Sequence, residues 1–191
     1  EVLVYDNGAG EVRQRMRLDR TAQLTIADRL PDLGPHARFA AIQYARGDLI
    51  YVQDDDVIVS DPRAIVDEWL EVEAIVAAEH GQPDFVVCNM PPEFRKVYTD
   101  TALIGFGAAF HRIAPAKAFD RFFAFHGLDR DDQLFLRESC RVFTVLSPRV
   151  LVDVPKTDLP WASAPNRLWK QPDHIEMRER MLKLAREVRD S

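Results

Sequence analysis

Residues 49–56 are LIYVQDDD, a short apolar run followed, after one glutamine, by three aspartates. Apolar runs of this length are typical of strands buried on both faces of an α/β sheet. Ligands of such sheets bind beyond the carboxyl ends of the strands. Adjacent carboxylates repel one another, and a bound cation relieves that repulsion. We therefore expect residues 49–52 to form a buried strand that leads into a ligand site.

Strand and helix patterns alternate on both sides of this stretch. The alternation predicts an α/β fold with a mixed, mainly parallel sheet that is flanked by helices. The expected strands are residues 2–5, 49–52, 85–88, part of 101–110, and one or two within 143–154. The expected helices are residues 37–45, 61–79, 115–126, 129–140 and 173–189. Residues 12–30 are polar and ambiguous. A length of 191 residues without an evident linker indicates a single domain.

Composition excludes several classes of protein. The formal net charge of -6 argues against nucleic acid as the main partner. No apolar run is long enough to span a bilayer. Cys88 and Cys140 are too few and too isolated for a disulfide scaffold, so we expect two small buried side chains. The chain begins within a strand pattern and without methionine, so we expect an N-terminally incomplete domain. We also expect a cytoplasmic location. Nothing in the sequence indicates the oligomeric state.

The acidic triplet Asp54-Asp55-Asp56 has two interpretations. Carboxylate oxygens suit hard divalent ions such as Mg²⁺ and Mn²⁺, which also bind phosphate oxygens. Such an ion can neutralise charge that develops on a diphosphate leaving group. The alternative is an acidic surface turn in which Asp61-Pro62 caps the next helix. The apolar strand before the triplet and the apolar residues 57–59 after it favour the metal site.

The stretch Val52-Gln53-Asp54-Asp55-Asp56 resembles the metal-binding acidic motif of GT-A glycosyltransferases, and above all that of the exostosin-like group, glycosyltransferase family 64. Other features occur in the same order along nearly the whole chain: Val4-Tyr5-Asp6-Asn7, Arg38, the glycine-containing segment 102–111, Asp131-Asp132-Gln133, and Leu168-Trp169-Lys170 followed by His174 and Arg178. Two features depart from the pattern. The first strand of the family, with its nucleotide-binding loop, has no counterpart, and residues 88–101 form a shorter segment than in the animal enzymes.

The resemblance implies a metal-dependent transferase that moves a sugar from a nucleoside-diphosphate sugar. The expected donor is a UDP-sugar, the acceptor is a carbohydrate or glycosylated molecule, and the anomeric configuration is retained. The implied metal ligands for Mn²⁺ or Mg²⁺ are Asp54, Asp56 and His174. The implied donor-binding residues are Asp6, Asn7, Arg38, Asp54, Asp55, Gly105, Gly107 and Arg178. The implied catalytic residues are Asp131, Asp132 and Arg178.

Each of these residues also has a structural interpretation. Asp131 and Asp132 could favour a helix N-terminus, with Asp129 as the N-cap. His174 and Arg178, one helical turn apart, could face one ligand or lie on a solvated surface. Gly105 and Gly107 could mark a strand bulge. Three other activities stay open: an inverting transferase resembling family 2, a sugar-phosphate nucleotidyltransferase, and a non-catalytic protein that binds nucleotide sugars.

Overall fold

A computed structural model describes residues 2–5, 24–27, 33–80, 83–129, 132–160 and 170–191. Its main sheet has four strands in the order β3-β6-β5-β7. The strands are β3 (Leu49–Val52), β6 (Ala108–His111), β5 (Val86–Asn89) and β7 (Arg149–Val152). Two further pairs are the parallel strands β1 (Val2–Tyr5) and β2 (Leu24–Ala27), and the antiparallel strands β4 (Val57–Val59) and β8 (Lys156–Asp158).

The four-stranded sheet is mixed, as predicted, but its neighbouring strands are mostly antiparallel. Strand β6 runs antiparallel to both β3 and β5, and only β5 and β7 pair in parallel. The prediction that neighbouring strands pair mainly in parallel is therefore wrong. Strand β6 lies between β3 and β5, which share a direction, and it runs opposite to both. Since β3, β5 and β7 all point the same way, their carboxyl ends meet at one edge of the sheet.

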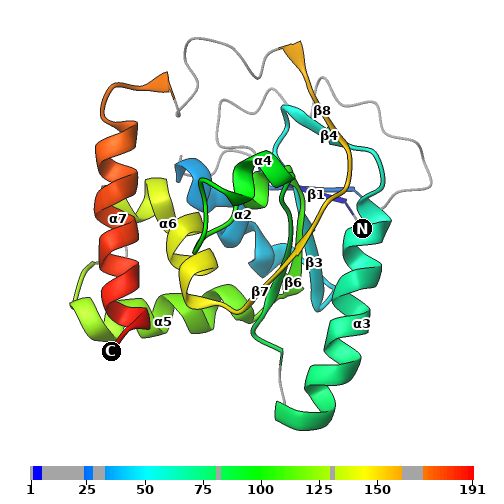
Figure 1. The fold of residues 1–191 in the computed structure, drawn as a ribbon, viewed down its shortest axis with the longest axis horizontal. Helices are drawn as coiled ribbons and strands as arrows, with labels where there is room; N and C mark the ends of the chain where they lie inside the picture. The colour runs from blue at the N-terminus through cyan, green and yellow to red at the C-terminus, as the bar shows by residue number, and fades with distance from the viewer. Residues whose placement is uncertain (1, 6–23, 28–32, 81–82, 130–131, 161–169) are drawn as a thin grey trace.

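Helices cover both faces of this sheet (Figure 1). The longest ones are α3 (Pro62–His80), α5 (Ala114–His126), α6 (Gln133–Leu146) and α7 (His174–Arg189). Short helical turns are η1 (Gly34–His36), α2 (Ala37–Ala40), η2 (Ala41–Tyr44), α4 (Pro92–Arg95) and η3 (Ile104–Phe106). None of the helices in the described ranges has both the length and the apolar character needed to cross a membrane.

Alternation along β5 divides the core into two halves. Val86 and Cys88 pack in the cluster that α5, α6 and α7 cover, whereas Val87 packs against Ile65 and Trp69 of α3. This period of two is the normal geometry of a strand with covered faces. The edge strand β3 is less enclosed: all four of its residues are only partly buried, so the prediction that it is buried on both faces is wrong.

Helix α6 begins and ends later than the sequence predicts. The Asp132 carboxylate accepts hydrogen bonds from the backbone amides of Leu134 and Phe135, at 2.8 and 3.1 Å. Asp132, and not Asp129, is therefore the N-cap. The helix then continues through residues 143–146, the first part of the segment 143–154 in which we predicted one or two strands; the strand in that segment is β7. Phe143 is fully buried in the core, so tertiary packing outweighs the β-propensity of this apolar segment.

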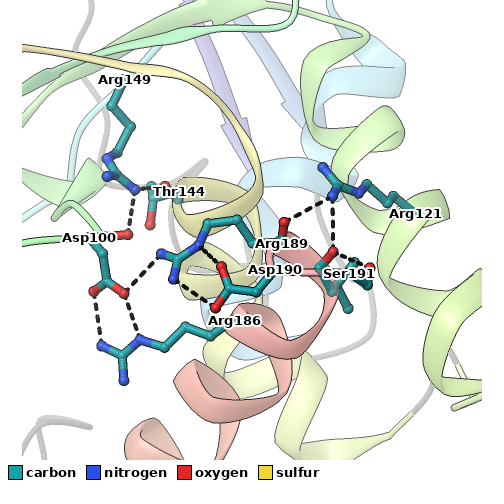
Figure 2. A network of polar contacts seen from close by, with 9 residues as sticks. Asp100, Arg121, Thr144, Arg149, Arg186, Arg189, Asp190 and Ser191 are labelled. Carbon is teal, nitrogen blue, oxygen red and sulfur yellow. Dashed lines mark hydrogen bonds and ion pairs between the residues drawn. The ribbon is translucent and has the colours of Figure 1, made fainter.

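A polar network ties the end of α7 to the loop that precedes η3 (Figure 2). The Asp100 carboxylate accepts two hydrogen bonds from Arg186, at 2.6 and 2.9 Å, and one from Arg189 at 3.1 Å. Arg149 of β7 donates to the Asp100 carbonyl oxygen, and also to the Thr144 carbonyl oxygen of α6 at 2.5 Å. One aspartate thus links a loop, the last helix and an edge strand.

Candidate functional site

The acidic triplet lies where the sequence places it, at the carboxyl end of β3. Asp54 donates its backbone N–H to the carbonyl oxygen of Gly105 over 2.9 Å. Its carboxylate Oδ1 forms an ion pair with Nη2 of Arg38 from α2, at 2.7 Å. The predicted association of Arg38, Asp54 and the glycine segment is therefore present. Asp54 and Asp56 are both partly buried, whereas Asp55 between them is exposed.

The glycines of this segment make room for the protein's own groups. A Cβ atom on Gly105 would lie 2.0 Å from Oδ2 of Asp54, which is far inside van der Waals contact. Gly107 has a φ of +107°, and a Cβ there would come within 2.9 Å of both Ile65 and the Tyr51 hydroxyl. The structure thus gives Gly105 and Gly107 roles in packing around Asp54 and β3, and their lining of a donor site stays a prediction.

Arg38 is the cation that balances the triplet. Burial disfavours its charged form, but Cys140 and the carboxylates of Asp54 and Asp56 more than offset that effect and raise the pKa of the guanidinium. A second contact, from Nε to the Pro35 carbonyl oxygen at 3.1 Å, fixes the direction of the side chain. With 21% of its side chain exposed, Arg38 stays accessible to an anion that reaches Asp54.

Asn89, at the end of β5, organises the same edge of the sheet. Its side-chain amide donates to the carbonyl oxygens of Phe106 and Val154, at 3.0 and 2.9 Å, and its Oδ1 accepts from the Val154 amide at 2.8 Å. Asn89 is fully buried, and it joins the glycine segment to the chain that leaves β7. Sequence reasoning missed this residue. The available signal was a polar side chain directly after an apolar strand.

A second polar cluster lies where α6 packs on α7. His174 and Arg178 lie one turn apart on α7, as predicted, and they contact each other through the ring Nε2 and the guanidinium Nη2. The other ring nitrogen, Nδ1, lies 3.4 Å from Oε1 of Glu138 on α6. Arg178 also donates to the Tyr98 hydroxyl at 3.0 Å, and Arg141 lies 3.8 Å from Oε2 of Glu138.

This geometry does not support the predicted metal-binding role of His174. Both of its ring nitrogens face protein groups, and one of those groups is the cation of Arg178. Burial, together with the charges of Arg178, Arg141 and Arg137, lowers the pKa of His174 to about 4. Its imidazole is therefore neutral near pH 7, but the surrounding positive charge opposes a divalent ion.

Cys140 of α6 is within electrostatic range of residues from both clusters. Burial raises the pKa of its thiol, while the charges of Arg38 and Arg141 act in the opposite direction and those of Asp54 and Glu138 raise it further. These electrostatic partners come from both the triplet and the α6–α7 cluster. Residues of both groups are therefore within electrostatic range of one thiol, and that thiol belongs to a partly buried side chain.

Several predicted site residues lie outside the described ranges or have another evident role. Asp6, Asn7 and Asp131 lie outside the described residues, as does Trp169. Asp132 is described, and its carboxylate caps α6. An open pocket of about 240 Å³ lies beside α2 and α5, and its lining includes His36, Phe39, Gln43, Arg112 and Phe119 but none of the predicted site residues.

Two carboxylates, Asp54 and Asp56, are the oxygen donors that the described residues offer to a hard cation. No group of three or more His, Cys, Asp or Glu side chains in the described ranges is arranged to hold a metal ion. Mg²⁺ is commonly bound by one or two carboxylates, with water and substrate phosphates completing its shell. Two carboxylates are within that number, and Oδ1 of one of them, Asp54, is already paired with Arg38.

Comparison with known proteins does not assign the chain to a family. No protein-family model matches it. There is also no significant match among the curated proteins or among the solved structures. Its function must therefore be argued from its own residues.

Proposed function

We propose that this chain is a metal-dependent glycosyltransferase of the GT-A type, which takes a sugar from a nucleoside-diphosphate sugar. The observation that carries the proposal is the setting of Asp54. Its carboxylate lies between Arg38 and Gly105 at the carboxyl edge of the sheet, with Asp56 two residues further along. This is the edge where α/β sheets bind ligands, and it combines a pair of hard oxygen donors with a fixed cation.

In this proposal Asp54 and Asp56 hold Mn²⁺ or Mg²⁺ together with the donor diphosphate. When bound, the ion supplies positive charge that stabilises the diphosphate as a leaving group. Arg38 holds Asp54 in place through its 2.7 Å contact. It also offers its remaining N–H groups to the nucleoside end of the donor. UDP is the nucleotide that we propose, following the resemblance to family 64.

Arg178 and Asp132 have separate tasks in the proposed reaction. Arg178 donates hydrogen bonds to the diphosphate, because a guanidinium can contact two phosphate oxygens at once. Asp132 lies against the transferred sugar, where its carboxylate steadies positive charge that develops at the anomeric carbon. Retention of configuration belongs to the proposal, with the acceptor hydroxyl losing its proton to the departing diphosphate.

A thermal-shift measurement with UDP and UDP-sugars, with and without Mn²⁺, tests the proposal. We expect stabilisation only when metal and nucleotide are both present. A ligand at about 100 times its Kd contributes about 2.7 kcal/mol. Asp56→Ala should abolish the shift, because it removes one of the two carboxylates. Asp67→Ala, which changes an exposed residue of α3, should preserve it. Absence of any shift when metal and nucleotide are both present would overturn the proposed function.

A further inference from the structure

Glu138 is a buried acid that the proposed reaction does not yet use. It is 3% exposed, it lies in the middle of α6, and it has non-helical dihedrals of φ -121° and ψ 15°. The helix is therefore interrupted where the carboxylate turns toward α7. A buried carboxylate is costly unless partners surround it. Here the partners are Arg141 and His174.

The contacts of His174 define which of its nitrogens carries the proton. The Arg178 guanidinium has only N–H donors, so the Nε2 atom that faces it must act as an acceptor. A neutral imidazole then carries its hydrogen on Nδ1. That nitrogen faces Oε1 of Glu138 at 3.4 Å, which is long for a hydrogen bond. Neither atom has a hydrogen-bond partner in the described part of the chain, so the two lie opposite each other with their hydrogen-bonding capacity unused.

Arg178 is held from two sides and has donor capacity left. His174 contacts Nη2, and the Tyr98 hydroxyl accepts from Nη1 at 3.0 Å. The Nε–H is buried and makes no hydrogen bond within the described residues. Each of Nη1 and Nη2 also has a second hydrogen. A guanidinium that is fixed in orientation but incompletely paired is suited to an oxyanion.

We infer that Glu138 is a positioning residue for oxyanion binding, which holds the Nδ1–H tautomer of His174 and thereby fixes the Arg178 guanidinium. The relay runs from α6 to α7: Glu138 Oε1 faces His174 Nδ1 at 3.4 Å, and His174 Nε2 accepts from Arg178. The identity of the oxyanion, the diphosphate of the donor, rests on the proposed function. The relay itself rests on the geometry of these three side chains.

The tautomer of His174 can be measured without any ligand. In ¹⁵N-labelled full-length protein at pH 7, long-range ¹H–¹⁵N correlation spectra distinguish Nδ1–H from Nε2–H imidazoles. The signal of His174 among the five histidines is the one that His174→Gln removes. We expect Nδ1–H in the wild type and in Glu138→Gln, whose side-chain carbonyl can still accept. Glu138→Leu should lose this preference. An Nε2–H tautomer in the wild type would overturn the relay, even if Glu138→Leu does not fold.

Binding of UDP in the presence of Mn²⁺ tests the consequence for Arg178. Glu138→Leu should weaken UDP binding by about 10- to 100-fold. This is the range found when a metal-binding histidine loses the hydrogen-bonded group that orients its ring. Uridine, which has no phosphate, should bind equally to both proteins. Glu138→Gln should restore UDP binding. Glu176→Gln, a change at an exposed acid of the same helix α7, is the matched control and should have no effect.

A double-mutant cycle separates the relay from general damage to the core. In His174→Gln the amide oxygen can accept from Arg178 without help from Glu138. Adding Glu138→Leu to that variant should therefore change UDP binding less than about twofold. An undiminished effect of Glu138→Leu in this background would overturn the relay. If wild-type protein binds no UDP, the proposed function fails, but the tautomer measurement still decides the relay.

Discussion

At the scale of single residues, the candidate site depends on the lack of a side chain at Gly105. Oδ2 of Asp54 occupies the space that a Cβ on residue 105 would fill, so glycine is the only residue that allows the observed carboxylate position. The resemblance to family 64 predicts that Asp54, Arg38 and the glycine segment belong to one donor site. It does not predict the contact with Gly105, since only the pairing of β3 with β6 brings that distant segment to Asp54.

Gly105→Ala should therefore disable the site. The added methyl group must displace the Asp54 carboxylate from Arg38, because the new Cβ atom and Oδ2 of Asp54 would otherwise lie 2.0 Å apart. We expect a loss of about 1–3 kcal/mol in the free energy of unfolding, typical of overpacking, and no Mn²⁺-dependent UDP binding. Gly47→Ala is the matched control, since its Cβ would meet only the Leu49 carbonyl oxygen at 3.7 Å. Equal effects of the two substitutions in chemical denaturation would contradict this interpretation.

His36 gives the protein a residue-scale sensitivity to acid. Its ring packs against Phe39, Phe119 and Phe135, and burial lowers its pKa to about 4. An unfolded histidine has a pKa near 6.5, so between pH 6.5 and 4 the unfolded state binds more protons. Stability should therefore fall as the pH falls through this window, by at most about 1.4 kcal/mol per pH unit for one histidine.

Comparison with His36→Phe isolates this contribution, because carboxylates and His174 titrate identically in both proteins. Phenylalanine also suits the aromatic surroundings of residue 36. The free energy of unfolding of the variant, measured by denaturation at several pH values, should decline less steeply between pH 6.5 and 4. Parallel curves for the two proteins would show that His36 is not responsible.

At the scale of elements, α6 carries the largest difference between sequence and structure. The sequence pattern predicts that a helix exists here, but it does not predict the residues at which the helix begins and ends. Asp129, Asp131 and Asp132 all suit a helix N-terminus, and only the amide contacts of Leu134 and Phe135 identify Asp132 as the cap. Likewise, residues 143–146 have the composition of a strand, and their helical state depends on the aromatic core around Phe143.

Substitutions at Asp132 separate capping from catalysis. Asparagine caps helices about as well as aspartate, whereas alanine costs about 1 kcal/mol. We therefore expect Asp132→Asn to keep the stability of the wild type and Asp132→Ala to lose about that amount. If Asp132 acts on the sugar, Asp132→Asn should also reduce donor turnover, followed as UDP release, by about 100-fold or more. Unchanged turnover in a stable Asp132→Asn protein would restrict the residue to capping.

At the scale of the whole molecule, the sequence predicts the number and kind of elements better than their arrangement. The apolar run at residues 85–88 predicts β5, and in the structure both halves of the core use residues of this strand. The insertion of β6 between β3 and β5 is a long-range pairing that no local pattern encodes. The His174–Glu138 contact escaped prediction for the same reason: each residue is ordinary in its own helix, and only the packing of α6 on α7 joins them.

The Asp100 network stabilises the whole molecule, because it fastens the end of α7 to the loop that leads to Gly105. Hydrogen bonds from Arg186, opposed by partial burial and reinforced by Arg189, lower the pKa of Asp100 to about 2. An unfolded aspartate titrates near 3.8. The stabilisation is therefore complete above about pH 4 and is lost as the pH falls toward 2. Because Arg186 and Arg189 are partly exposed, screening by solvent limits the stabilisation from the Asp100 contacts to about 1 kcal/mol.

Asp100→Asn should remove that stabilisation at pH 7, and the difference from the wild type should shrink below pH 4. Chemical denaturation at pH 7 and pH 3 measures both values, and Glu187→Gln, an exposed acid of α7 outside the network, is the control. Since α7 carries His174 and Arg178 at its first turn and the Asp100 contacts at its last, loosening one end should also increase motion at the other. Asp100→Asn should accordingly accelerate amide exchange in the first turn of α7, and exchange that changes only around Arg186 would show that the two ends are independent.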